Sequence, residues 1–94
     1  MIQVLSWGAA AAMALHVPRY YFHHCDSERT NDEEGVELSS VQAARSYATD
    51  CARDMCCADL KEGWLNLDHR IEVADEAGEH ILTITYREAF ELRN

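Results

Sequence analysis

The chain has 94 residues and a mass of 10.7 kDa, which is enough for one small domain. Lys and Arg total 8 and Asp and Glu total 17, so the formal net charge is −9. This acidity argues against a general nucleic-acid binder, because phosphate contacts need a surplus of basic side chains. With 48% apolar residues the chain is not disordered throughout, and no apolar run reaches the roughly 18 residues of a membrane span.

Residues 1–16 carry no acidic or basic side chain apart from His16, whereas all 25 Lys, Arg, Asp and Glu residues follow from Arg19 onward. A secretory signal needs basic residues before its apolar stretch, and none is present here. A helix is compatible with the segment because Gly8 is its one strong helix breaker. We prefer a third interpretation, in which translation was assigned to begin too far upstream.

The next segment predicts a strand, a polar loop and a short second strand. Residues 19–25 are β-prone and aromatic, with Tyr21, His23 and Cys25 on one face and Tyr20, Phe22 and His24 on the other. Residues 26–37 contain a run of acids, which predicts a solvated loop with a turn or bulge at Gly35. A short strand over residues 36–38 would complete a hairpin.

A long helix is predicted to begin after Ser39 and to end near Glu62. Ser39 is a suitable N-cap, Gln42 would complete a capping box, and Gly63 suits the position after the C-cap. At 100° per residue one apolar stripe forms, flanked by Tyr47, Ala52 and Ala58; its members are Val41, Ala44, Ala48, Cys51 and Met55. We expect this stripe to pack on a sheet.

A second hairpin follows the helix. Residues 70–74 alternate with Ile71 and Val73 inward, and residues 75–78 predict a type I turn with Gly78 in the left-handed position of a bulged hairpin. Residues 80–86 return with Leu82, Ile84 and Tyr86 inward. We expect residues 87–92 to form a helical turn that packs Phe90 on the sheet.

These elements predict an α+β fold of ββαββ order: a four-stranded antiparallel sheet with one long helix packed on one face. Residues 17–94 would form a single domain of marginal size. The uncovered sheet face and the exposed edge strands make homodimerisation a candidate property.

Three motifs resemble a known family: Val17-Pro-Arg-Tyr-Tyr-Phe-His23, then Asp32-Glu-Glu-Gly35-Val-Glu-Leu38, then Ile71-Glu-Val-Ala-Asp75-Glu-Ala-Gly78. They resemble a family of small bacterial proteins that is catalogued only as a domain of unknown function. The resemblance implies a fold but no activity, substrate or catalytic residue. His24, Cys25 and the three helix cysteines depart from the family pattern.

The resemblance also bears on the N-terminus, because Val17 lies where family members have their initiator Met. A GTG codon is read as Val internally and as Met at a start. We therefore hypothesise that the natural protein starts at position 17.

Several side chains could bind a metal or act as nucleophiles, but their spacing argues against both roles. The chain has no C-x2-C or H-x3-H pair, and neighbouring strand residues point to opposite faces. His23 and Cys25 share a face and are the first candidates for a metal site or a thiolate–imidazole pair. We see no third group to orient them, so we expect no metal, no cofactor and no catalysis.

Cys57 lies off the apolar stripe with Arg53 and Lys61 one turn away on either side, which makes it the candidate reactive thiol. Without a signal peptide the cysteines should be reduced, which favours a cytoplasmic protein. We expect a small acidic binding or regulatory module whose partner is a basic protein surface or a second copy. The candidate partner-binding residues are Asp26, Glu28, Asp32, Glu33 and Glu34; the alternative is a metal-binding or Cys/His-dependent small enzyme.

Overall fold

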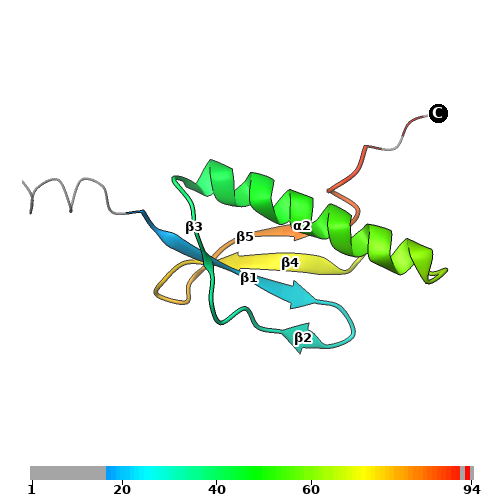
Figure 1. Cartoon of the computed structure of the whole chain (residues 1–94), viewed down its shortest axis with the longest axis horizontal. Coiled ribbons are helices and arrows are strands. Elements are labelled where there is room, and N and C mark those ends of the chain that lie inside the picture. The colour runs from blue at the N-terminus through cyan, green and yellow to red at the C-terminus, as the bar shows by residue number, and fades with distance from the viewer. Residues whose placement is uncertain (1–16, 92, 94) are drawn as a thin grey trace, which may run out of the picture.

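The computed structural model describes residues 17–91 and 93, where one helix lies across an antiparallel sheet (Figure 1). In chain order the elements are β1 (Arg19–Cys25), β2 (Arg29–Thr30), β3 (Val36–Glu37), α2 (Val41–Lys61), β4 (Arg70–Ala74) and β5 (His80–Thr85). The predicted α+β class is confirmed. The uncharged segment 1–16 lies outside the described residues, so the start at position 17 stays a hypothesis. Within the described part, no helix has the length and apolarity to cross a membrane.

The sheet has five strands rather than the four predicted. Its order is β2-β1-β4-β5, and β3 also pairs with β1. β2 meets the end of β1 at His24 and Cys25, whereas β3 meets its start at Arg19 and Tyr20. The element order is therefore βββαββ, and the segment predicted to be a solvated loop contains an extra strand, because it folds back along the edge of β1.

Gly35 makes this return of the chain sterically feasible. Its φ is +70°, a region that favours glycine, and a Cβ there would stand 2.8 Å from the carbonyl oxygen of Tyr20. The expected turn at Gly35 is thus present, and the absent side chain lets two backbone segments touch.

Helix α2 begins one residue later than predicted. Its N-cap is Ser40, whose hydroxyl oxygen accepts a hydrogen bond from the Ala43 N–H at 3.1 Å. The predicted capping box of Ser39 and Gln42 is therefore wrong. Ser39 stays in the connection because the preceding residue, Leu38, donates its N–H to the Pro18 carbonyl at 3.0 Å and prolongs the pairing beside β1.

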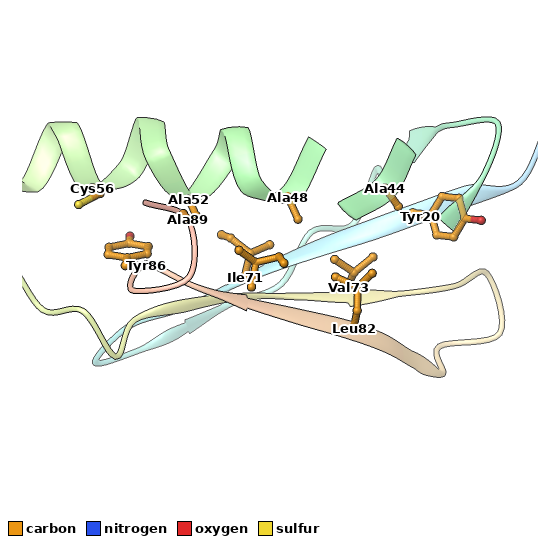
Figure 2. Close-up of a cluster of buried hydrophobic side chains, with 11 residues drawn as sticks. Tyr20, Ala44, Ala48, Ala52, Cys56, Ile71, Val73, Leu82, Tyr86 and Ala89 are labelled. Carbon is orange, nitrogen blue, oxygen red and sulfur yellow. The ribbon is translucent and has the colours of Figure 1, made fainter. Parts of the chain in front are cut away.

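The core lies between α2 and the sheet, and Figure 2 shows its small helix side chains above larger strand side chains. The helix contributes Ala44, Ala48, Ala52 and Cys56; the sheet side contributes Tyr20, Ile71, Val73, Leu82, Ile84 and Tyr86. The buried face of α2 is rotated relative to the predicted stripe. Ala52 and Cys56 are buried, whereas Cys51 and Met55 pack at the border of the core. Val41, at the start of the predicted stripe, is 47% exposed. Alanines let the helix approach the strands closely, so the smallest residues define the buried face.

The second hairpin forms as predicted, with Gly78 at φ +82° and the Asp75 carboxylate accepting N–H bonds from Ala77 and Glu79. The chain end differs from the prediction. Residues 86–89 form a turn that buries Ala89, whereas Phe90 is 37% exposed. Arg53 holds this turn, because its Nε donates to the Ala89 carbonyl at 2.7 Å and leaves Phe90 to point elsewhere.

Candidate functional site

An apolar hollow of about 270 Å³ lies at the C-terminal end of α2. Three segments build it: the last turns of the helix, the loop that follows them, and the chain after β5. Its lining residues are Cys56, Leu60, Leu65, Leu67, Arg87, Phe90 and Glu91. We call this feature the apolar hollow.

The helix end determines where the first wall of the hollow runs. Gly63 has φ +93°, as its predicted place after the C-cap requires, and its N–H donates to the Leu60 carbonyl at 3.0 Å. The Trp64 N–H donates to the Asp59 carbonyl at 3.3 Å. These two bonds form a Schellman cap, which reverses the chain so that Leu65 and Leu67 return beside Leu60.

The second wall is held to the first by backbone hydrogen bonds. The Tyr86 N–H donates to the His69 carbonyl at 2.8 Å, and the Arg87 N–H donates to the Leu67 carbonyl at 3.1 Å. Both walls are therefore fixed by the backbone. The hollow exists before any ligand arrives.

Large apolar side chains are exposed around the hollow. Leu60 is 52% exposed, Trp64 44%, Leu65 44% and Phe90 37%. Scattered exposed apolar residues are ordinary, but a cluster of them around a hollow is typical of an interaction site.

A set of ring contacts joins the loop after α2 to the end of the second hairpin. Trp64 contacts the ring of His69 edge-on at 5.7 Å between centroids, and His69 contacts Tyr86 in the same way at 5.6 Å. The Tyr86 hydroxyl lies 3.0 Å from Nε2 of His24. Nδ1 of His69 is buried and has no hydrogen-bond partner among the described residues. The rings support the loop that carries Trp64 and Leu65.

Two polar groups at this end of the core stay protonated near pH 7. Burial, with a smaller contribution from Asp59, raises the pKa of Tyr86 to about 12, so its hydroxyl keeps its proton. Burial likewise raises the pKa of the Cys56 thiol. Figure 2 shows these two side chains at the same end of the core. Of the two, Cys56 lines the hollow, and its protonated thiol is a poor nucleophile, so the hollow suits an apolar group.

The structure separates the predicted acidic candidates into two kinds. Asp26, Glu28, Glu33 and Glu34 are exposed, whereas Asp32 is half-buried. The carboxylate of Asp32 accepts N–H bonds from Phe22, Glu34 and Gly35, each at 3.1 Å. Burial acts to raise the pKa of Asp32, but these N–H bonds hold it below its ordinary value. Asp32 thus organises its own loop.

Asp26 also has a local role. One of its carboxylate oxygens accepts the N–H of Glu28 at 2.8 Å. This bond lowers the pKa of the Asp26 carboxyl. Both carboxylates therefore stabilise turns, and Glu28, Glu33 and Glu34 remain the candidates whose side chains project outward.

His23 and Cys25 share the sheet face that α2 does not cover, yet each is engaged elsewhere. Nδ1 of His23 accepts the Asp32 N–H at 3.1 Å, and Cys25 is buried beneath Arg29, which is paired with Glu72. Burial, followed by the Glu72 charge, raises the pKa of Cys25, so the thiol stays protonated near neutral pH. Among the described residues no group of three or more His, Cys, Asp or Glu could hold a metal ion.

All four cysteines are free, and Cys57 is the exposed one. Cys51 is half-buried, and Cys25 and Cys56 are buried. The reactivity of Cys57 stays a prediction.

The sequence analysis missed the apolar hollow. A signal was present, because Trp64, Leu65 and Leu67 follow the helix-ending Gly63 within five residues. Large apolar residues clustered in a loop indicate a surface that another part of the molecule or a partner covers.

Comparison with known protein families identifies the domain. Residues 19–87 match the model of a domain of unknown function, DUF6894. The chain belongs to this family. No curated protein and no solved structure matches the chain.

Proposed function

We propose that this family member is a non-catalytic protein-binding module that docks its partner in the apolar hollow. The observation that carries the proposal is that the exposed apolar residues Leu60, Leu65 and Phe90 line a preformed hollow, with exposed Trp64 next to Leu65 in the chain. Protein interfaces concentrate their binding energy where one apolar or aromatic side chain fills a pocket of the partner. The hollow supplies such a pocket.

The size of the hollow favours a side chain over a small molecule. Its volume of about 270 Å³ lies below the roughly 300–1,000 Å³ of typical small-molecule sites. The exposed side chains around it extend the contact area beyond the hollow, as a protein surface requires. The thiol of Cys56, which lines the hollow, has a raised pKa, and this supports binding rather than reaction.

The acidic loop, residues 26–37, is a second candidate surface outside the hollow. Glu28, Glu33 and Glu34 are exposed there on a chain of net charge −9, so they would attract a basic surface rather than the group that fills the hollow. The free state of all four cysteines supports a reducing compartment such as the cytoplasm.

Photo-crosslinking in cells that make the protein tests the proposal. A photoreactive phenylalanine analogue replaces Leu65 in one variant and Val41 in another. Both positions carry apolar side chains of similar exposure, 44% and 47%, but Val41 lies at the opposite end of α2. We expect one discrete protein adduct from position 65 that position 41 does not give. Equal adduct patterns from the two positions, or none from position 65, would refute the proposal.

A further inference from the structure

We propose that the protein in the apolar hollow is a second copy of this chain, with the two hollows facing each other across a two-fold axis. This inference rests on the proposed function and names its partner. In a two-fold interface the same patch on both copies must be complementary to itself.

The patch contains both the projections and the recess that self-complementarity needs. Leu60, Leu65 and Phe90 line the hollow, and 52%, 44% and 37% of these residues' surfaces are exposed, so large apolar groups lie at its edge. A two-fold axis at the lip would let the exposed part of one Phe90 or Leu65 enter the hollow of the other copy. Each copy would then exclude water from the other.

The charge distribution points to the same end of the molecule. The segments that build the hollow, residues 53–69 and 86–93, carry four basic and six acidic side chains. The rest of the chain carries four basic and eleven acidic side chains. Six of those acids lie in residues 26–37 beside a single Arg, so two copies repel each other less hollow to hollow than through this acidic loop, which a basic partner would favour.

The charged groups on the lip can rearrange for a second copy. Arg87 and Glu91 both line the hollow, and they carry opposite charges. Arg87 is paired at 3.6 Å with Asp68, and both side chains are largely exposed, so the pair is weak and exchangeable. Across a two-fold axis, Arg87 of one copy would face Glu91 of the other.

The composition of the core supplies a further reason for pairing. The helix gives three alanines and one cysteine to the core, while Leu60, Trp64, Leu65 and Phe90 stay outside. A domain this small buries a limited share of its apolar surface alone. A second copy would cover the large side chains that the fold leaves in water.

Sedimentation of the purified full chain tests this inference. From about 1 µM to about 1 mM protein we expect a shift from 10.7 kDa to twice that mass. Leu65→Asp should weaken the dimer at least about 30-fold, because it places a charge in an apolar contact. Val41→Asp, with the same charge change at similar exposure, should leave the dimer intact. Leu60→Lys is the second variant, because a cation near a helix C-terminus favours the fold.

Salt distinguishes a second copy from a basic partner. Raising NaCl from about 0.05 M to about 0.5 M shortens the screening length several-fold. The dimer of an acidic chain should tighten, whereas binding to a basic protein would weaken. A monomer at every concentration, or equal effects of Leu65→Asp and Val41→Asp, would overturn the inference. An adduct from position 65 to a different protein would also overturn it while leaving the proposed function intact.

Discussion

Nε of Arg53 donates a hydrogen bond of 2.7 Å to the carbonyl oxygen of Ala89, which ties the chain after β5 to the side of α2. The turn that it holds buries Ala89 and presents Phe90 at the hollow. A single helix side chain thus positions one wall of the candidate site.

Replacing Arg53 with Met should loosen that wall. Loss of one charge-assisted hydrogen bond by a half-exposed side chain should lower the free energy of unfolding by about 1 kcal/mol or less. Amide exchange at Ala89 should accelerate more than exchange in β4. Arg45→Met, at an exposed position on the same helix, is the control. Equal exchange rates at Ala89 in the two variants would show that Arg53 does not hold the wall.

The contact between Gly35 and Tyr20 predicts a large effect of one methyl group. Gly35→Ala should lower the free energy of unfolding by at least about 2 kcal/mol more than Gly63→Ala. Both glycines have positive φ, so alanine would suffer the same backbone strain at either position. A Cβ at position 63, however, would meet nothing within 4 Å. Urea denaturation of both variants gives the comparison. Similar losses would mean that β3 does not lie against β1 as described.

Asp32 should make the stability of the fold depend on acid. Its pKa is lowered in the folded chain, so its ionised form stabilises the fold above the unfolded pKa near 3.9, and this contribution is lost as pH falls below about 4. In Asp32→Asn the side-chain NH2 group cannot accept a hydrogen bond, so one set of the N–H bonds to position 32 is lost. The free energy of unfolding at pH 7 should fall by about 1 kcal/mol.

The pH profile separates this effect from general acid unfolding. Between about pH 5 and pH 2 the unfolding free energy of Asp32→Asn should fall less steeply than that of the wild type. Glu33→Gln changes an adjacent exposed carboxylate and is the matched control. A wild-type profile parallel to that of Asp32→Asn would contradict the assigned role.

The cysteines should react with an alkylating reagent in the order of their exposure. Cys57 should be modified first, Cys51 more slowly, and Cys25 and Cys56 after unfolding begins. Peptide mass spectrometry of native protein sampled over time measures this order. Faster modification of Cys51 than of Cys57 would mean that the helix is rotated from its described phase.

Local patterns predicted the longer elements well, because their signals are contained within them. The alternation of inward and outward side chains predicts β1 and the strands of the second hairpin. Gly78 predicts the turn of that hairpin, and Gly63 predicts the end of α2. The extra strand β2 has two residues and no alternation of its own. Its position depends on pairing with β1 and on the contact of Arg29 with Glu72, a residue 43 positions away.

The candidate site could not be predicted because it depends on tertiary packing. The helix pattern placed Ala44 and Ala48 on the buried face correctly. It did not show that Cys56 would be buried more deeply than Cys51 and Met55, nor that Ala89 would be buried in place of Phe90. Both outcomes depend on how closely α2 approaches β5, which no local pattern contains. The acidic run in the sequence identified the five acidic candidates. It could not show that the Asp32 carboxylate accepts hydrogen bonds from backbone N–H groups, because these bonds form only in the fold.

Hydroxyl-radical footprinting of the apolar hollow, in cells and in dilute purified protein, is the most direct test of the docking surface. If the hollow docks a protein, Leu60, Trp64, Leu65 and Phe90 will be oxidised less in cells than in dilute solution. Val41 and Tyr47, which are also exposed, will be oxidised equally in both. Equal oxidation of the four residues in both settings, or protection confined to Val41 and Tyr47, would contradict the account.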